Sequence, residues 1–514
     1  MASQHPKPAS AAASRSSEAL CKSLTGIKGL DTITGGGLPT GRATLVCGGA
    51  GTGKSILAME FLYRGIAEFD EPGVLMTFEE SPLDVAQNMH SLGFDVQSMV
   101  SSRKMVMDCV VLDPEEVLEG GSFNLEGLFI RLGQAIDSIG AKRVVLDTID
   151  SLFSCLPNPA RIRSELHRLF RWLKDKGVTA IVTGESGMDT YTRDGLEEYV
   201  SDCVILLTVS VSDRMASRFL RIIKYRGSDH GKNEYPFVID GRGIALFPIT
   251  AEGLDWQASQ DHISSGVKKL DQMLGGAGFY QGSTVLVSGS AGTGKSTFLA
   301  SFINAACLRK ERAIYISFEE SPSQIVRNMN SIGIRFEQHL EQGLLRIESY
   351  RCTQCDLEQH LLNIHRVIEE FLPRAVVIDP ITSLSDISSH LFIKRMLAKL
   401  TGLLRTRGVS LMLGSLTPSG ATPEGTSASI SSLIDSWIFL REIEGDGEFN
   451  RALVIRKSRG MNHSNKVREF KITDDGIDIC EVMYGATGVL TGRARQLQSA
   501  ERVAEIKQSE IDAG

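Results

Sequence analysis

Short runs of β-branched and other apolar residues alternate along the chain with longer stretches whose apolar positions recur at helical spacing. Residues 43–47 (ATLVC), 143–147 (RVVLD) and 179–184 (TAIVTG) are runs of the first kind, and 161–177 (RIRSELHRLFRWLKDKG) is a stretch of the second. Alternation of strands and helices is typical of βαβ units. The pattern therefore predicts an α/β fold with mostly parallel central sheets.

The same pattern runs through the chain twice. Residues 25–55 return in similar form as 264–296, and 74–82 (VLMTFEESP) return as 314–322 (IYISFEESP), in the same order. Such self-similarity indicates an internal duplication, so each half should fold as one copy of the same domain. The predicted division is a disordered, Ser- and Ala-rich tail at 1–17, a first domain at 18–255, a second domain at 256–485 and a helical C-terminal tail at 486–514.

Composition narrows the class of protein. The chain has 514 residues, of which 42% are hydrophobic and 23% charged, a profile typical of soluble globular proteins with more than one domain. The formal net charge of −7 does not indicate the excess of positive charge that is typical of nucleic-acid-binding proteins, so we do not expect nucleic-acid binding. The nine cysteines suggest no disulfide framework, and no run is long and apolar enough to cross a membrane, so we expect a cytoplasmic protein.

Two glycine-rich segments, 48–55 and 289–296, match the phosphate-binding pattern G-x-x-x-x-G-K-S/T. Each follows a predicted strand and opens a predicted helix, where backbone N–H groups converge on phosphate oxygens. We predict two ATP sites, each with Mg²⁺ held by the last serine of the pattern and by Asp147 or Asp379 at a later strand end. The predicted ATP-binding loop residues are Gly49, Ala50, Gly51, Thr52, Gly53, Lys54 and Ser55 in the first domain, and Ser290, Ala291, Gly292, Thr293, Gly294, Lys295, Ser296 and Thr297 in the second.

Two adjacent carboxylates end a predicted strand beside each expected phosphate site. They are Glu79 and Glu80 in the first half, and Glu319 and Glu320 in the second. Phosphoryl transfer from ATP needs a group that orients or deprotonates the nucleophile, and a carboxylate can supply it. We predict these four residues as catalytic candidates. Because side chains alternate along a strand, one of each pair should face ATP.

Taken together, these motifs resemble the KaiC family of tandem RecA-like ATPases. The resemblance extends over 24–479 and includes 196–202 (LEEYVSD), 224–237 (KYRGSDHGKNEYPF) and 457–470 (KSRGMNHSNKVREF). It implies two RecA-like P-loop domains in each chain. It also implies a homohexamer of two stacked rings that binds ATP and Mg²⁺.

The resemblance assigns basic residues to the nucleotides as well. In that family, Lys-x-Arg segments reach the nucleotide of a neighbouring subunit, where cations offset the charge that develops in phosphoryl transfer. The matching residues here are Lys224, Arg226, His230, Lys457, Arg459 and His463. The resemblance adds further ATP contacts at Ser91, Tyr225 and Ser228 in the first domain and at Arg451 and Ser458 in the second, with Glu319 as a further Mg²⁺ ligand.

An autophosphorylation pair is also implied. It corresponds to Ser431 and Ser432, whose counterpart segment in the first half has no hydroxyl pair. The resemblance implies that the second domain phosphorylates these serines on the adjacent subunit with Glu319 as general base, and that the first domain only hydrolyses ATP. Return of the phosphate to ADP would make the protein an autophosphatase. Thr426 is a further candidate acceptor, and Ile332 stands where clock members carry a base-stacking Trp.

Protein partners are the last implication. Residues 119–132 resemble the region that binds the thioredoxin-like protein KaiB, whereas the C-terminal tail differs from the clock proteins' docking segment, which argues against KaiA as a partner. The tail's apolar spacing suits either an amphipathic or coiled-coil helix that joins rings or a simple surface helix. Besides a kinase for signalling or timing, two functions stay open. One is a RecA/RadA-like DNA-dependent ATPase, and the other is a ring-forming nucleotide sensor without kinase activity.

Overall fold

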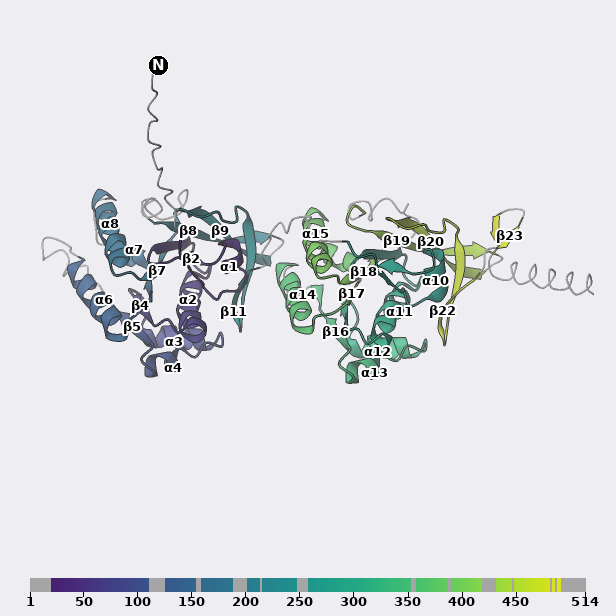
Figure 1. The fold of residues 1–514 in the computed structure, drawn as a ribbon, viewed down its shortest axis with the longest axis horizontal. Coiled ribbons are helices and arrows are strands. Elements are labelled where there is room, and N and C mark those ends of the chain that lie inside the picture. Colours follow the sequence, from purple (N-terminus) through teal and green to yellow (C-terminus); the bar gives the residue numbers. More distant parts are fainter. Residues whose placement is uncertain are drawn as a thin grey trace, which may run out of the picture. The chain divides into compact units, whose positions relative to one another are not determined.

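The computed structural model contains two compact units, each built on a nine-stranded sheet (Figure 1). The central strands of each sheet are parallel and helices cover both faces, which confirms the prediction of two tandem α/β domains with mostly parallel sheets. The described residues are 20–110, 125–153, 159–187, 201–212, 215–246, 258–352, 357–386, 390–417, 431–445, 448–480, 483–485 and 488–490.

In the first unit, the strand that precedes the phosphate loop, β3, lies at the centre of the sheet. Its neighbours β7 and β8 both run parallel to it. Beyond β8 the sheet continues through β9, β10 and β11, which pair antiparallel with one another, an extension that the sequence pattern did not predict. In sheet order the strands are β11 (Gly243–Leu246), β10 (Glu234–Asp240), β9 (Met215–Tyr225), β8 (Cys203–Ser212), β3 (Ala43–Gly48), β7 (Thr179–Glu185), β6 (Arg143–Asp147), β4 (Gly73–Thr77) and β5 (Met105–Cys109).

The second unit repeats these pairings strand for strand. Its central strand β14 lies between β18 and β19, both parallel to it, and the sheet ends in an antiparallel extension from β19 to β22. In sheet order the strands are β16 (Leu345–Ser349), β15 (Ala313–Ser317), β17 (Ala375–Asp379), β18 (Ser410–Leu416), β14 (Thr284–Gly289), β19 (Ser436–Gly445), β20 (Glu448–Ser458), β21 (Arg468–Thr473) and β22 (Gly476–Ile479).

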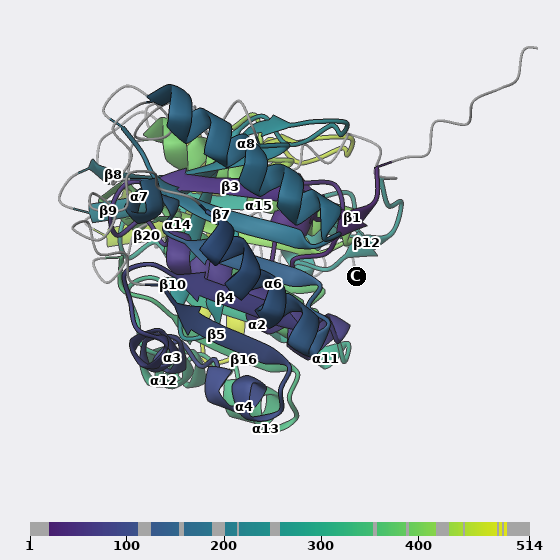
Figure 2. The ribbon, with the colours of Figure 1, turned by 90° about the vertical axis from the view of Figure 1, so that its left-hand side faces the viewer.

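Both faces of each central sheet are buried because successive strand residues are apolar. In β3, Leu45 packs in a cluster with residues of α6 and α8, whereas Val46 packs in another with residues of α2. Figure 2 shows α6 and α8 in front of the first sheet. The longer helices are α2 (Lys54–Phe69), α3 (Pro82–His90), α6 (Glu126–Ile139) and α8 (Pro159–Asp175) in the first unit, and α11 (Lys295–Leu308), α12 (Pro322–Asn330), α14 (Leu357–Phe371) and α15 (His390–Thr406) in the second.

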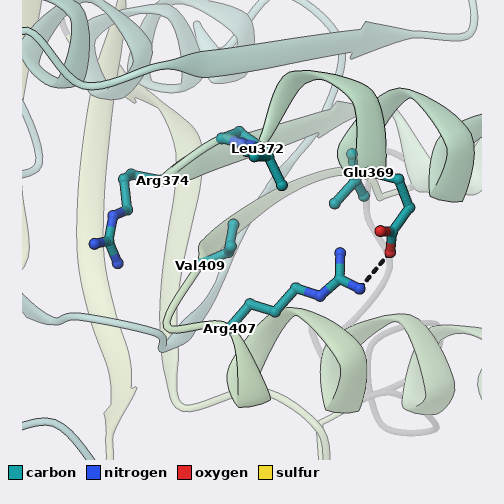
Figure 3. A pocket seen from close by; sticks show the side chains of 7 residues that line it. Glu369, Leu372, Arg374, Arg407 and Val409 are labelled. Atoms are coloured by element: carbon teal, nitrogen blue, oxygen red, sulfur yellow. Dashed lines mark ion pairs between the residues drawn. The ribbon is translucent and has the colours of Figure 1, made fainter.

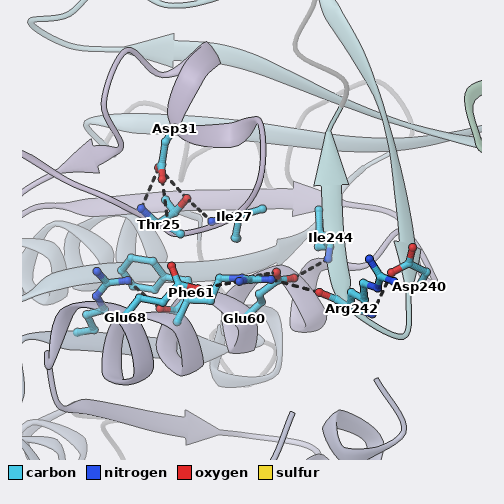
Figure 4. Close-up of polar contacts among 12 residues, drawn as sticks. Thr25, Ile27, Asp31, Glu60, Phe61, Glu68, Asp240, Arg242 and Ile244 are labelled. Carbon is cyan, nitrogen blue, oxygen red and sulfur yellow. Dashed lines mark hydrogen bonds and ion pairs between the residues drawn. The ribbon is translucent and has the colours of Figure 1, made fainter. Parts of the chain in front are cut away.

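A buried carboxylate ties helix α2 to the edge of the first sheet (Figure 4). Glu60 is fully buried; its Oε2 accepts a hydrogen bond from the Ile244 amide at 2.6 Å, and its Oε1 accepts one from Arg64 Nε at 2.6 Å. Gly243 has a φ of 96°, and a Cβ there would lie 2.5 Å from Glu60 Oε2. Burial raises the pKa of Glu60, and the two hydrogen-bond partners oppose that shift.

We expect Glu60→Ala to lower the free energy of unfolding of the first unit by about 3 kcal/mol, because it leaves the buried Ile244 amide and the Nε of Arg64 without the acceptor that they have now. Urea unfolding checks this. Glu68→Ala is the matched control, since its carboxylate pairs with Arg64 nearer the surface and should matter by less than about 1 kcal/mol. Equal losses in the two variants would contradict the assignment of Glu60 as a tie.

A cavity of about 530 Å³ lies in the second unit, lined by residues at the amino ends of β17 and β18 (Figure 3). Within it, Arg407 pairs with Glu369. The first unit has an equivalent ion pair, Lys176 with Asp137 at 3.0 Å. Ligands of open α/β sheets bind at the carboxyl ends of the strands, which is the opposite edge. We therefore attribute these charges to the packing of helix ends rather than to nucleotide binding.

Candidate nucleotide sites

The two glycine-rich segments form loops between the central strand and the next helix. Gly51 and Gly53 have φ values of 73° and 102°, and Gly292 and Gly294 have 80° and 92°, conformations that favour glycine. A Cβ at Gly53 would lie 2.7 Å from Cδ1 of Ile239. Neither α2 nor α11 has a side-chain cap at its N-terminus, so its first amides are available to an anion. The loops therefore fit phosphate groups.

The lysine of each loop folds back over the loop's own backbone. Lys54 Nζ donates to the carbonyls of Gly48 and Gly49 at 2.9 and 3.0 Å. In the second unit, Lys295 Nζ donates to the equivalent carbonyls at 3.1 and 2.7 Å. Burial lowers the pKa of Lys295, and the carboxylates of Asp379 and Glu319 oppose that shift. Both ammonium groups thus lie at the loops, where the sequence places them.

The other predicted loop residues surround these lysines. Thr52 and Thr293 are buried, and each hydroxyl donates at 2.8 Å to the carbonyl of the residue three positions earlier, Gly49 or Ser290. Ala50, Gly51, Ala291 and Gly292 are exposed at the loop tips, and Thr297 is buried in α11. The positive-φ glycines and these threonine bonds hold the loop backbone open.

The predicted Mg²⁺ aspartates differ between the units. Asp379 is 8% exposed, and its Oδ2 accepts hydrogen bonds from Ser296 Oγ at 2.6 Å and from the Tyr315 hydroxyl at 2.9 Å. Burial raises the pKa of Asp379, while these two hydrogen bonds lower it. In the first unit Ser55 is exposed, and Asp147 instead accepts a hydrogen bond from Thr183. Among the described residues, no group of three or more His, Cys, Asp or Glu side chains is arranged so that it could hold a metal ion by itself. The serine–carboxylate pair fits Mg²⁺, which typically combines few protein ligands with phosphates and water.

The paired glutamates point in different directions, and do so in the same way in both units. Glu79 accepts hydrogen bonds from Ser151 and Thr148, which follow β6, and Glu319 accepts one from Ser383, which follows β17, at 3.0 Å. The second members face the next helix instead. Glu80 accepts from Asn88 at 3.5 Å and Glu320 from Asn328 at 2.9 Å. Burial raises the pKa of Glu320, and the charge of Asp379 adds to the shift.

The basic residues of the first unit lie beside the amino ends of the central strands, whereas its phosphate loop lies at their carboxyl ends. The loop follows Gly48, at the carboxyl end of β3. The Arg226 amide, in contrast, donates to the Asp202 carbonyl at 2.9 Å, immediately before β8 begins beside Thr44. Lys224, Tyr225, Arg226, Ser228 and His230 all lie at the end of β9 or in the turn that follows it. One chain therefore does not bring these side chains to its own phosphate loop.

The second unit has the same separation. Ser458 pairs with Ser436, which pairs with Val285 near the start of β14, whereas the phosphate loop follows Gly289. The strand between Val285 and Gly289 alone spans about 13 Å. Lys457, Ser458, Arg459 and His463 lie at the end of β20 or in the segment after it.

The predicted phosphate acceptors lie beside these cations. Ser431 and Ser432 are in the turn before β19, and Ser432 is exposed. Lys457 Nζ donates at 2.7 Å to the carbonyls of both Ser431 and Ile434. Burial lowers the pKa of Lys457, and Arg459 adds to that shift. The structure thus brings the acceptor turn and the predicted trans-acting lysine together, and places both away from Glu319 of the same chain.

Arg451 is a predicted ATP contact that lies beside the phosphate loop of its own chain, and its equivalent in the first unit was not among the predicted residues. Arg451 Nε donates to the Gly292 carbonyl at 3.1 Å, so this residue serves the loop of its own chain. Arg218 is its equivalent, since it pairs with Phe237 as Arg451 pairs with Phe470. The buried Nε of Arg218 has no hydrogen-bond partner among the described residues. The internal repeat could have identified Arg218, because each arginine stands six positions before its Lys-x-Arg segment.

Some of the remaining predicted residues have positions in the structure, and the others lie outside its described residues. Ser91 is exposed at the end of α3, where its hydroxyl donates to the Asn88 carbonyl, and Ile332 packs against the core of the second unit. Among the described residues, no helix is both long and apolar enough to span a membrane. The predictions for 1–17, 119–124, 196–200, Thr426 and 491–514 concern residues outside the described part of the chain.

Comparison with known proteins finds the same duplication. A family model described as "ATPase: KaiC" matches residues 23–251 and again 263–483. The chain is 47% identical over 497 residues to the circadian clock protein KaiC2 of Synechocystis sp., covering 96% of this chain and 88% of that protein. It is 37% identical over 489 residues to the circadian clock oscillator protein KaiC of Synechococcus elongatus, covering 94% of each. Two copies of the family's ATPase domain, in register with the two phosphate loops, account for almost the whole chain, and the chain therefore belongs to the KaiC family.

Proposed function

We propose that this protein is an ATPase and serine autokinase of the KaiC type. Its first domain, at 18–255, hydrolyses ATP, and its second domain, at 256–485, transfers phosphate to Ser431 and Ser432 of a neighbouring subunit. The KaiC family match and the two phosphate loops support nucleotide binding in both domains. The divergence of the halves at the acceptor turn supports the assignment of kinase activity to the second domain.

One observation carries the proposal. The acceptor turn and Lys457 are hydrogen-bonded to each other at the edge of the sheet opposite the phosphate loop. A single chain therefore presents acceptors and cations that it cannot apply to its own nucleotide. A second copy that sets this edge against the first copy's loop would complete the site. This arrangement favours a closed ring, and we propose the hexamer of the KaiC family.

In the proposed reaction the Oγ of Ser431 or Ser432 attacks the terminal phosphorus of ATP held by the neighbour's loop. An Oγ–P bond forms, the bond from phosphorus to the bridging oxygen of ADP breaks, and the serine proton passes to the carboxylate of Glu319. Lys457, Arg459 and His463 would stabilise the charge on the transferred group. Mg²⁺, held by Ser296 and Asp379 and with Glu319 as a further candidate ligand, would neutralise phosphate oxygens.

The first domain would use the equivalent parts for hydrolysis. Glu79 takes the place of Glu319 and would orient water, while Ser55 and Asp147 would hold Mg²⁺. Lys224, Arg226 and His230 would come from the neighbour, and Ser91, Tyr225 and Ser228 would line the ATP site. Because no hydroxyl pair matches Ser431 and Ser432 in this half, water is the only acceptor that we propose there.

Role and partners follow from the relatives. The relatives' names describe circadian clock proteins, and we propose that phosphorylation of this protein serves timing or another form of signalling in the cytoplasm. A KaiB-like protein that binds around 119–132 is the partner that we propose. The C-terminal tail would join rings in place of a KaiA contact.

Incubation of the purified protein with γ-labelled ATP and Mg²⁺, followed by phosphopeptide mapping over time, tests the proposal. We expect label on Ser431 and Ser432, and none when both are changed to alanine. Thr426→Ala should leave the label on Ser431 and Ser432 in place. Nucleotide binding without any label on the 431–432 peptide would contradict the kinase and favour a nucleotide sensor.

A further inference from the structure

Asp147 ends strand β6, and Asp379 ends the equivalent strand β17. In each unit a side chain from a neighbouring strand donates a hydrogen bond to this aspartate, but the two donors lie on opposite sides of the strand. In the second unit the donor is the hydroxyl of Tyr315 on β15, 2.9 Å from Asp379 Oδ2. In the first unit the donor to Asp147 is Thr183 on β7. Tyr315 is 1% exposed, and its ring lies in the core beneath α11. A tyrosine hydroxyl in such a core needs a hydrogen-bond partner, and Asp379 accepts its hydrogen bond.

The strand registers show that the two units differ in residue type at two equivalent positions. Tyr315 pairs with Val377 as Leu75 pairs with Val145, so the first unit has an apolar side chain where the second has the tyrosine. Thr183 matches Gly414, the fifth residue of β18 as Thr183 is the fifth of β7. The first unit therefore has Leu and Thr at these positions, and the second has Tyr and Gly.

Space explains why both positions differ between the units. A Cβ at Gly414 would lie 2.2 Å from Asp379 Oδ1 and 2.9 Å from Cδ1 of Leu299. Asp379 therefore occupies the room that a side chain on β18 would need. Of the two strands beside β17, β18 therefore has no room for a donor to Asp379, and β15 supplies one through the long side chain of Tyr315.

We infer that Tyr315 is a positioning residue of the second domain: its hydroxyl, with the room left by Gly414, holds the Asp379 carboxylate toward Ser296 and so sets the divalent-cation affinity of that domain's nucleotide site. The inference rests on the proposed function, because it takes Ser296 and Asp379 as the residues that hold the cation. It adds that the two sites of one chain depend on different second-layer residues, Tyr315 in one and Thr183 in the other.

Binding of Mn²⁺ to the full-length protein, measured by electron paramagnetic resonance with a non-hydrolysable ATP analogue, tests this. The bound Mn²⁺ divides into two classes, which Asp147→Asn and Asp379→Asn assign to the first and second domains. Tyr315→Phe keeps the ring and removes the hydroxyl. We expect it to weaken the second-domain class about tenfold and to leave the first-domain class unchanged, because loss of an outer-shell hydrogen bond typically costs 10- to 100-fold in metal affinity.

Two matched variants make the result specific. Thr183→Val should weaken the first-domain class alone. Tyr280→Phe removes another tyrosine hydroxyl of the second unit, one that donates to the Gly460 carbonyl at 3.4 Å, and should change neither class. Affinity for the nucleotide in the presence of a chelator should be the same in wild type and Tyr315→Phe, since a general loss of folding would lower it.

A substitution at Gly414 tests the space that the Asp379 carboxylate needs. Gly414→Ala should weaken the second-domain class, because its Cβ displaces Asp379. If Asp379→Asn weakens Mn²⁺ binding and Tyr315→Phe leaves it within twofold of wild type, the inference is wrong and the proposed site stands. If Asp379→Asn also has no effect, the proposed site fails and takes the inference with it.

Discussion

Chains with Lys295→Ala should become phosphorylated on Ser431 and Ser432 once they are assembled with chains that carry Ser431→Ala and Ser432→Ala, although neither variant is phosphorylated alone. The first variant lacks the ammonium at the second phosphate loop but keeps the acceptors, and the second has the reverse defect. Complementation is expected because the acceptor turn lies at the sheet edge opposite its own loop.

Different affinity tags on the two variants allow the label to be assigned to one chain. We expect label on the Lys295→Ala chains, rising from background to a level similar to that of the wild type. The control pairs Lys295→Ala with Lys457→Ala chains that keep their serines and loop. Such mixtures show whether the lysine must come from the chain that accepts phosphate. An unlabelled mixture, despite mixed rings in native mass spectrometry, would refute transfer between subunits.

Glu319→Gln should lower the rate of autophosphorylation by at least about 100-fold while leaving ATP bound, because the amide cannot accept the serine proton and general-base catalysis typically contributes 10²- to 10⁴-fold. The amide keeps the size of the side chain and can still accept the hydrogen bond from Ser383. Quench-flow incubation with γ-labelled ATP, followed by mapping of the 431–432 peptide, measures the rate.

Two glutamine variants bracket that result. Glu79→Gln should abolish most ATP hydrolysis by the first domain and leave the second domain's phosphorylation chemistry intact. Glu320→Gln changes the neighbouring carboxylate, which accepts a hydrogen bond from Asn328, and should have a much smaller effect than Glu319→Gln. If Glu320→Gln were the more damaging of the two, the catalytic assignment within the pair would have to be reversed.

The parts of the site that the sequence predicts are those made by contiguous residues. The loops around Lys54 and Lys295 are local structures, since glycine conformations and a helix N-terminus are encoded within eight residues. The parallel core follows from strand and helix periodicity in the same way. The duplication then indicates which features belong to both copies, including the glutamate pairs.

Features that depend on pairing between distant strands could not be predicted. The antiparallel extension places Lys457 beside Ser431, but its register joins residues that are far apart along the chain. Tyr315 is a further example. In the sequence it is one apolar-patterned residue of a buried strand, and its contact with Asp379 depends on the register of β15 and β17 and on the space at Gly414.

The location of Lys457 and Ser431 at the far edge of the sheet has a kinetic consequence under the proposed function. Donor and acceptor belong to different copies, so dilution that separates the copies removes the reaction itself rather than only slowing it. The extent of modification would then report how much of the protein is assembled at a given moment. A cell could change that extent by altering the amount of the protein, without any change in ATP or in a second enzyme.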